Sequence, residues 1–304
     1  MPHRPFRFGV VTAQARSGED WIARARRVEQ LGYATLLMPD RLVGPVLSPL
    51  PALAIAAAAT HHLRVGTFVL ASGLRNPLLL ARECATLDFL TGGRFELGLG
   101  AGVSEDDFRQ AGIPFGQPGA RVDRLTETLA IVKALWSGQE VTVGGSHDTV
   151  AGAHGYPPPV QQPRPPILVA GAGRRMLSLA AREADIVALG VGATAGEAEV
   201  SEKIDWLRQE AGDRFPRLEL SLNLAAVVGD EPLDPRVHQR LHAIFHVDLD
   251  QLVKAGSLFV LAGSVDQICE QLLACRERLG VSYVTIAHDM METLAPVVER
   301  LAGQ

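Results

Sequence analysis

Short β-rich apolar runs alternate with amphipathic helical segments along the whole chain. The expected strands cover residues 6–12, 35–39, 65–71, 95–100, 167–171, 185–190, 221–228 and 282–287. Strands that alternate with helices in this way are typical of a parallel sheet with crossover helices. A chain of 304 residues slightly exceeds the roughly 250 residues of a typical (β/α)8 barrel. We therefore predict a (β/α)8 TIM barrel made by a single domain, residues 1–304.

Helix boundary signals agree with this alternation. Asn76 before Pro77 is typical of an N-cap followed by a proline in the first helical position. Ser264 and Gln267 have the spacing of a capping box, and Gly280 is placed to end the same helix. We expect such helices to form the outer ring of the barrel.

Two stretches are longer than a minimal barrel requires. Residues 139–166 contain the pair Gly144-Gly145 and a proline-rich run, which excludes a central strand or helix there. Residues 229–262 contain a further short helix with several histidines. We expect both insertions at the mouth of the barrel, after strands four and seven, where loops carry function.

The composition excludes several classes of protein. The chain is 47% hydrophobic with a net charge of −5, which suits an enzyme with a large core and argues against nucleic-acid binding. No apolar run reaches the roughly 20 residues needed to cross a membrane, and the first residues lack a signal core. We therefore expect a cytoplasmic protein. Its 3 cysteines, Cys84, Cys269 and Cys275, have no spacing that indicates a zinc site or a disulfide framework.

The stretch 92–102 ends an expected strand in alternating glycines, Gly98, Gly100 and Gly102, with Ala101 between the last two. Glycine in this place indicates that something approaches the backbone closely. The segment therefore suggests a cofactor pocket at the carboxyl end of a strand. A Rossmann fingerprint is not indicated, because no third glycine opens a helix and no acidic residue follows at the ribose distance.

The turn Gly171-Ala172-Gly173-Arg174-Arg175 follows an expected strand and leads into an expected helix from Met176 to Glu183. A helix N-terminus presents unpaired N–H groups and the positive end of the helix dipole, which favour an anion. The arginines add positive charge, so we predict a phosphate-binding turn. The alternative is a simple connection between strand and helix.

Three histidines with regular spacing raise the question of a metal site. His238, His242 and His246 follow at successive i, i+4 spacing, but three ligands along one helix diverge, and no acidic residue completes a metalloprotease pattern. We therefore predict no metal site. His288 and Asp289 follow the last expected strand, where barrels often carry catalytic groups. They are candidates for proton transfer, with helix capping as the alternative.

Taken in order, several segments resemble one family. They are Leu31-Gly32-Tyr33, Met38-Pro39-Asp40-Arg41, Arg64-Val65-Gly66-Thr67, Arg75-Asn76-Pro77, Ala85-Thr86-Leu87-Asp88, Gly92-Gly93-Arg94, Gly119-Ala120-Arg121, Leu135-Trp136, the segment from Pro166 to Gly173, and Ala180-Ala181-Arg182-Glu183-Ala184-Asp185. This set resembles the bacterial-luciferase-like superfamily of flavin and deazaflavin enzymes, in particular its coenzyme F420-dependent oxidoreductases. The resemblance implies a luciferase-like barrel that holds its cofactor at the carboxyl ends of the strands, in a homodimer or higher homo-oligomer.

The resemblance also implies roles for particular residues. Asp40 would contact the cofactor or the reacting centre; its alternatives are a helix N-cap or an ion pair with Arg41. A non-proline cis peptide between Phe68 and Val69 would support the cofactor ring, and an ordinary core strand is the alternative. Residues Gly100, Ala101 and Gly102 would place backbone donors along the edge of the ring, with Asp106 as a polar neighbour. Asp40, Asp106 and His288 are then the candidate proton donors or acceptors.

The implied function is hydride transfer between a deazaflavin, coenzyme F420, and a small organic substrate. Arg41 and Val103 stand where a relative that oxidises a sugar phosphate has histidine and glutamate, so that substrate is not expected. The first alternative is an FMN-dependent two-component monooxygenase of the same fold. Further alternatives are a non-redox barrel enzyme and a catalytically silent flavin-binding protein.

Overall fold

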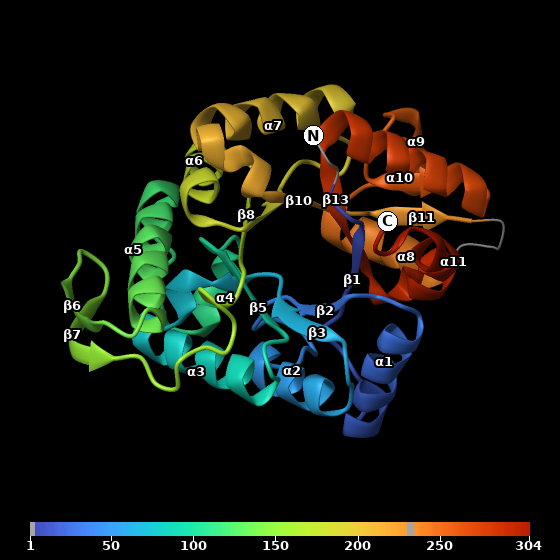
Figure 1. Cartoon of the computed structure of the whole chain (residues 1–304). Helices are drawn as coiled ribbons and strands as arrows, with labels where there is room; N and C mark the ends of the chain where they lie inside the picture. The colour runs from blue at the N-terminus through green and yellow to red at the C-terminus, as the bar shows by residue number, and fades with distance from the viewer. Residues whose placement is uncertain (1–3, 230–233) are drawn as a thin grey trace. The chain divides into compact units, whose positions relative to one another are not determined.

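The computed structural model describes residues 4–229 and 234–304 (Figure 1). Its internal contacts divide the chain into two compact units. The first unit comprises Met1–Thr12, Arg27–Leu36 and Gly171–Gln304, and the second comprises Ala13–Arg26 and Leu37–Ala170. Helix α1 (Gly18–Gln30) and strand β2 (Thr35–Met38) contribute residues to both.

Parallel strands form the centre of the first unit. They pair in the order β1, β13, β10, β9, with bounds β1 (Arg7–Val11), β9 (Ile186–Leu189), β10 (Glu219–Asn223) and β13 (Val281–Ala287). Phe8 of β1 and Leu222 of β10 both pair with Val284 of β13. All three side chains are buried, as expected for parallel strands that are covered on both faces. A separate parallel pair contains β11 (Ala226–Val228) and β12 (Val260–Ala262).

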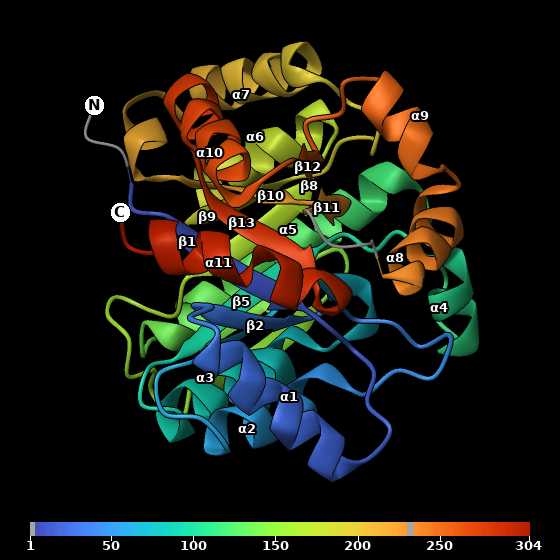
Figure 2. The ribbon, with the colours of Figure 1, turned by 90° about the vertical axis from the view of Figure 1, so that its right-hand side faces the viewer.

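Helices follow the strands of the first unit. They are α6 (Arg174–Glu183), α7 (Glu197–Ala211), α8 (Pro235–Arg240), α9 (Leu249–Lys254), α10 (Val265–Leu279) and α11 (Met291–Leu301), with the short turns η2 (Gly212–Arg217), η3 (Leu241–Phe245) and η4 (His288–Met290). The predicted capping box of Ser264 and Gln267 is confirmed at the start of α10, and Gly280 ends that helix in a left-handed conformation. Figure 2 shows α10 next to α7.

Strand β5 (Phe95–Gly100) is the central strand of the second unit. It pairs in parallel with β3 (Arg64–Thr67), β4 (Leu70–Ala71) and β8 (Ile167–Gly171). Strands β3 and β4 are two parts of the expected strand 65–71, separated by Phe68 and Val69. The peptide bond between these two residues is cis, as the family resemblance implies.

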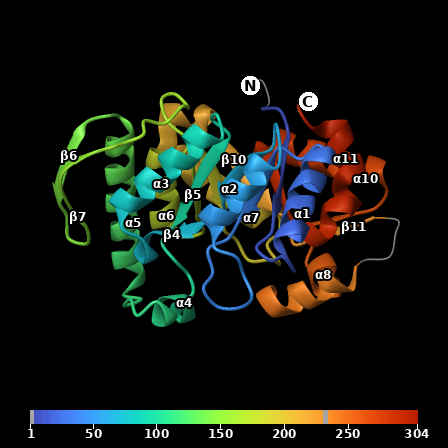
Figure 3. The ribbon, with the colours of Figure 1, turned by 90° about the horizontal axis from the view of Figure 1, so that it is seen from below.

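The helices of the second unit follow its strands. They are α2 (Pro49–Ala58), α3 (Pro77–Leu90), α4 (Glu105–Gln110) and α5 (Pro118–Trp136), with the short turn η1 (Ser72–Leu74). The predicted N-cap is confirmed, because the Asn76 side chain accepts hydrogen bonds from the backbone of Leu78 and Leu79. Figure 3 shows α2 and α3 lying next to each other.

The first insertion contains an antiparallel hairpin, β6 (Glu140–Gly144) and β7 (Thr149–His154), which lies beside α5 (Figure 1). The proline-rich part that follows does not lie at the carboxyl ends of the strands. Gln161 instead bonds to the Phe95 carbonyl and accepts from Arg64, at the starts of β5 and β3. The expectation of a mouth position is wrong for this part, because it leads from the end of helix α5 into the start of β8.

The predicted fold class is confirmed: parallel strands followed by helices make a (β/α)8 TIM barrel, in which β3 and β4 count as one strand. The expected strand 221–228 consists of two strands, β10 and β11. Of the second insertion, residues 230–233 lie outside the described residues. No helix in the described ranges is long and apolar enough to cross a membrane. The single-domain assignment stays a prediction.

Candidate functional site

Asp40 follows the fully buried strand β2 in the second unit, and its side chain is only 2% exposed. Its oxygens accept hydrogen bonds from the Ala71 backbone N–H, 3.0 Å away, and from both terminal nitrogens of Arg75, one of them at 2.8 Å. The carboxylate is therefore neutralised by a partner 35 residues further along the chain. The suggested ion pair with Arg41 is not formed.

Arg41 bonds instead to Asp107, with its Nε 2.8 Å from the carboxylate. The other oxygen of Asp107 accepts from the backbone N–H groups of Leu42 and Val43, at 2.9 and 3.0 Å. Burial raises the pKa of Asp107. The two backbone hydrogen bonds, a further hydrogen bond with the Ser104 side chain and the charge of Arg41 outweigh burial and hold the pKa below its ordinary value. Asp107 thus ties helix α4 to the segment after β2.

The predicted residue on this helix, Asp106, lies on its exposed side and pairs with Arg109 at 2.6 Å. Its side chain is 65% exposed. The family resemblance indicated Asp106, whereas the buried carboxylate of the pair is Asp107, which the sequence did not indicate. Ser104 at the N-cap gives a clue to this orientation, because its hydroxyl accepts from the Asp107 backbone and fixes the first turn of the helix.

The glycines of β5 are close neighbours of the interrupted third strand. A methyl group added at Gly98 would lie 1.9 Å from the Thr67 carbonyl oxygen, and one at Gly100 would lie 2.7 Å from a methyl of Val69. The sequence suggested that something approaches this backbone closely. Within the second unit, that neighbour includes the chain's own residues 67–69.

Gly102 lies two residues after the end of β5 and has a positive φ of 85°. A methyl group there would lie 2.7 Å from the ring of Phe108 in α4. Ala101, between the glycines, is half-buried. The second unit therefore brings together the cis peptide, the β5 end and the Asp40–Arg75 pair as parts of one set of strand ends.

The predicted phosphate-binding turn belongs to the first unit and precedes α6. Gly173 is the N-cap residue, with ordinary extended dihedral angles, and among the described residues no side chain caps this helix. No described atom lies within 4 Å of a methyl group added at Gly173. Gly173 therefore leaves space at the start of α6, and a helix N-terminus favours an anion.

Two cations flank this helix start. The Arg174 guanidinium lies 4.5 Å from the ring centre of Trp206 in α7, and Lys203 of α7 has its Nζ 3.5 Å from the Ala172 carbonyl oxygen. Lys203 is 14% exposed along its side chain and was missed from the sequence. It lies 31 residues from Ala172 in the chain, and only the packing of α7 against α6 reveals it.

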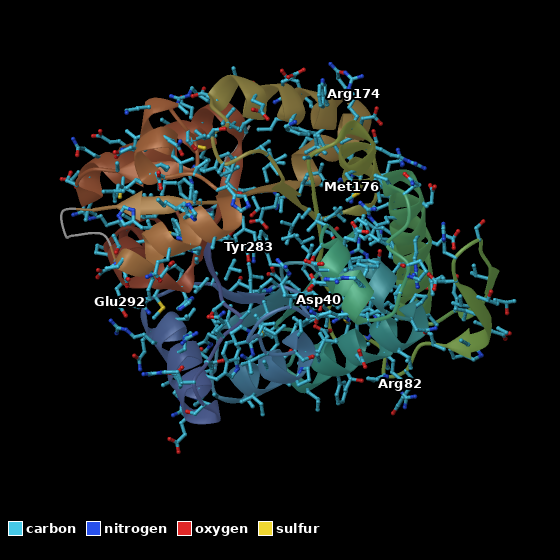
Figure 4. The ribbon with its side chains drawn as sticks, turned by 180° about the vertical axis from the view of Figure 1, so that it is seen from behind. Asp40, Arg82, Arg174, Met176, Tyr283 and Glu292 are labelled. Carbon is cyan, nitrogen blue, oxygen red and sulfur yellow. The ribbon has the colours of Figure 1, made fainter. Side chains whose placement is uncertain are left out.

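Gly171 has a different environment from Gly173. A methyl group at Gly171 would lie 2.6 Å from the Cβ of Met176. Arg174 and Met176, labelled in Figure 4, extend from the first turn of α6 toward different neighbours, Trp206 and Gly171. Gly171 is thus packed against its own helix, and the open position of the turn is Gly173.

His288 and Asp289 lie in η4, directly after β13 in the first unit. Asp289 bonds to Arg240 at 2.9 Å and is 4% exposed, so it forms an ion pair and not the suggested helix cap. The hydrogen bond from Arg236 lowers the pKa of Asp234 to about 2, and the nearby His288 adds to this effect through its charge. His288 therefore lies among charged groups of α8.

The three histidines of the second insertion do not share one regular α-helix. His238 lies in α8, His242 lies in the wider turn η3, and His246 has a positive φ of 54°. No group of three or more histidine, cysteine, aspartate or glutamate side chains in the described residues has the arrangement of a metal site.

The fold defines a class of protein, the (β/α)8 barrels. The family model of the luciferase-like monooxygenases matches residues 5–283. The chain belongs to this family and is an oxidoreductase.

Individual relatives include F420-dependent enzymes and a monooxygenase. An F420-dependent glucose-6-phosphate dehydrogenase of Beutenbergia cavernae is 33% identical over 181 residues, which cover 57% of this chain and 53% of that protein. The structure of coenzyme F420-dependent tetrahydromethanopterin reductase from Methanopyrus kandleri matches with a TM-score of 0.79 and 18% identity, over 98% of this chain and 99% of that one. The monooxygenase RslO1 from Streptomyces bottropensis matches with a TM-score of 0.78 and 20% identity, over 97% of each chain.

Proposed function

We propose that this protein is a coenzyme F420-dependent oxidoreductase that transfers a hydride between the deazaflavin and a small organic substrate. The observation that carries the proposal is the uncapped N-terminus of α6, with Gly173 open and the cations Arg174 and Lys203 beside it. These residues fit a phosphate group, because N–H donors, a helix dipole and fixed cations all favour an anion. F420-dependent enzymes among the relatives support the choice of cofactor.

The residues of the turn have separate tasks in this proposal. The backbone of Gly171, Ala172 and Gly173 and the side chain of Arg174 bind the cofactor phosphate. Lys203 adds charge and holds the Ala172 carbonyl, which keeps the neighbouring N–H groups directed outward. The deazaflavin, when bound, supplies the hydride chemistry, while the chain supplies position and charge.

The residues proposed for the ring belong to the second unit. Phe68, Val69, Gly100, Ala101 and Gly102 present a surface of backbone and apolar side chain, on which a flat ring is placed and water is excluded. Glycine is needed at Gly98 and Gly100 because residues 67–69 already fill the space that a side chain would take.

Asp40, Asp106 and His288 remain the proposed proton donors and acceptors. Their environments differ: Asp40 is buried and paired with Arg75, Asp106 is exposed, and His288 lies near Asp234.

The test uses two substitutions at one position. Gly173→Asp places a carboxylate at an N-cap whose dihedral angles suit aspartate, so the helix should keep or gain stability while anion binding is lost. Gly173→Asn has nearly the same shape without the charge and is the matched control. We expect F420 affinity, followed by fluorescence titration, to fall at least ~10-fold in Gly173→Asp and much less in Gly173→Asn. Equal affinity in both variants would exclude α6 as the phosphate site.

The alternative function is that of an FMN-dependent two-component monooxygenase, and the match to the family model of the luciferase-like monooxygenases supports a monooxygenase. Both cofactors carry a phosphate, so the α6 turn serves either. Oxygen uptake after addition of reduced FMN, with no turnover on reduced F420, would support the monooxygenase and contradict our proposal.

We also propose that the protein forms a homodimer or higher homo-oligomer through α2 and α3. The outward side chains of these neighbouring helices include Ile55, Leu79, Phe89 and Leu90, which are between 51% and 72% exposed. An apolar surface on two adjacent helices is typical of a protein–protein interface.

A further inference from the structure

A cavity of about 210 Å³ lies within the first unit, between the paired strands β10 and β13 and helix α10, which packs against β13 (Figure 2). Leu222 and Val284, which are register partners in the two strands, line the cavity together with Leu272 and Cys275 of α10. The lining residues differ from those proposed to bind the cofactor or to transfer protons. The cavity is therefore a feature of the first unit that the proposed function does not explain.

The walls of this cavity are mainly hydrocarbon. Leu222, Leu272 and Val284 are at most 3% exposed, and Phe6 adds an aromatic ring to the lining. Protein interiors normally contain few voids larger than a water molecule. A cavity of this size leaves its walls without the dispersion contacts that close packing supplies, and an apolar ligand would restore them.

The cavity can be reached from the protein surface beside β12. Gly256 is exposed, Leu258 and Val260 are half-buried, and all three belong to the lining. The lining thus continues from buried walls to residues in contact with solvent. A small molecule therefore has a way into the cavity.

The charged residues of the lining neutralise each other. Arg278 donates from Nε and Nη2 to the two carboxylate oxygens of Glu197, at 2.8 and 2.9 Å. Burial raises the pKa of Cys275 to about 11, so its thiol is uncharged at neutral pH. In the described part of the chain, the lining therefore presents no charge that lacks a partner to a ligand.

The uncharged polar side chains of the lining also have partners. Ser257 donates to the Ala193 carbonyl and accepts from the Phe259 N–H at 3.1 Å. Gln271 donates to the Ala262 carbonyl at 2.7 Å and accepts from the Ala262 N–H at 3.4 Å. A buried water needs roughly two to four polar partners. Because these groups are already hydrogen-bonded, the cavity suits a ligand made of carbon better than it suits water.

The volume of the cavity indicates the size of such a ligand. A dry cavity of about 150 Å³ lined by leucine, isoleucine and phenylalanine binds benzene. The cavity beside Cys275 is larger and has similar walls. A benzene ring with a small substituent therefore fits its volume.

We propose that this cavity binds a small uncharged apolar molecule of the size of a substituted benzene ring. The carbon atoms of the ligand lie against Leu222, Leu272 and Val284, and no hydrogen bond of the lining has to break. This proposal does not depend on the F420 assignment.

Isothermal titration calorimetry on the full chain tests the site with toluene and benzoate, each below its solubility limit. The two probes share the ring, and benzoate carries a carboxylate in place of the methyl group. We expect saturable one-to-one binding of toluene. Benzoate should bind at least ~10-fold more weakly, because its carboxylate loses hydration and Arg278 is already paired with Glu197.

Matched variants on α10 locate the binding in the cavity. Cys275→Phe places a ring in the space that toluene takes and should weaken toluene binding at least ~10-fold. Cys269→Phe makes the same change on the same helix outside the lining and should leave the affinity unchanged. Val260→Phe fills the cavity from β12, so it repeats the test if circular dichroism shows that Cys275→Phe does not fold.

Toluene binding that survives in Cys269→Phe and falls in Cys275→Phe or Val260→Phe supports the cavity, whatever the cofactor proves to be. Absence of saturable toluene binding by the wild type would overturn the proposal. Equal toluene affinity in the wild type and the filled variants, or benzoate binding as tight as that of toluene, would overturn it as well.

Discussion

Gly98 lies so close to Thr67 that the Gly98 position leaves no room for a side chain. The Thr67 hydroxyl donates to the Gly98 carbonyl and accepts from the Gly98 N–H, both at 2.8 Å, and a methyl group on Gly98 would lie 1.9 Å from the Thr67 carbonyl oxygen. These two hydrogen bonds between the Thr67 side chain and the Gly98 backbone replace regular strand pairing at the interruption between β3 and β4. The glycine is therefore required by the shape of the third strand, whatever cofactor the barrel binds.

We expect Gly98→Ala to lower the free energy of unfolding by ~3 kcal/mol or more, because the added methyl group meets backbone that cannot rotate away. Gly144→Ala is the matched control, since no described atom lies within 4 Å of its added methyl group. Guanidinium denaturation measures both. Equal stability of the two variants would show that the third strand is not held at residue 67.

The Asp40–Arg75 pair gives a second prediction. Loss of either partner leaves the other charge largely buried, so Asp40→Asn and Arg75→Gln should each cost ~2–4 kcal/mol of stability. The double variant should cost clearly less than the sum of the two, because the interaction is lost only once. Additive losses in urea denaturation would mean that the two side chains stabilise the fold independently.

Asp107 predicts a pH dependence of stability. Its pKa in the folded state lies below the ordinary value of 3.8, so the folded protein holds fewer protons on this group than the unfolded chain. Its contribution is therefore complete at neutral pH and is lost as the pH falls through the folded pKa, below ~4. The wild type should lose more stability than Asp107→Asn between pH 6 and pH 3 in denaturation experiments. An equal loss in both would assign the acid sensitivity to other carboxylates.

The proposed α2–α3 interface predicts the effect of a surface charge. Leu79→Glu should shift the protein toward the monomer, because burial of an unpaired carboxylate in the interface is costly. Val253→Glu in α9, where the side chain is 55% exposed, is the control and should leave the mass unchanged. Multi-angle light scattering measures the mass of each. A monomeric wild type would contradict the proposal.

Local signals in the sequence predicted much of the fold. The alternation of apolar runs and amphipathic segments located the strands, and Asn76 and Ser264 marked helix starts that the structure confirms. These signals work because hydrophobic periodicity and capping act over a few residues. The family resemblance located the cis peptide between Phe68 and Val69, and the structure contains it.

Partners that are distant in the chain were not predictable from such signals. The sequence suggested Asp40 with Arg41 and selected Asp106, whereas the structure pairs Asp40 with Arg75 and buries Asp107. Asp106 and Asp107 are adjacent in helix α4, so their side chains point in different directions. Which of the two faces the core depends on the rotation of the helix about its axis, and packing fixes that rotation.

The sequence alone determined the kind of barrel and the order of its strands and helices, because these depend on local periodicity and turn residues. Tertiary structure decided which charged side chains form ion pairs and which glycines have other atoms packed against them. Lys203 reaches the turn before α6 only because α7 packs there, and Gly173 is open while Gly171 is closed by Met176. Contacts of this kind depend on three-dimensional proximity between elements, which a single sequence does not encode in any short stretch.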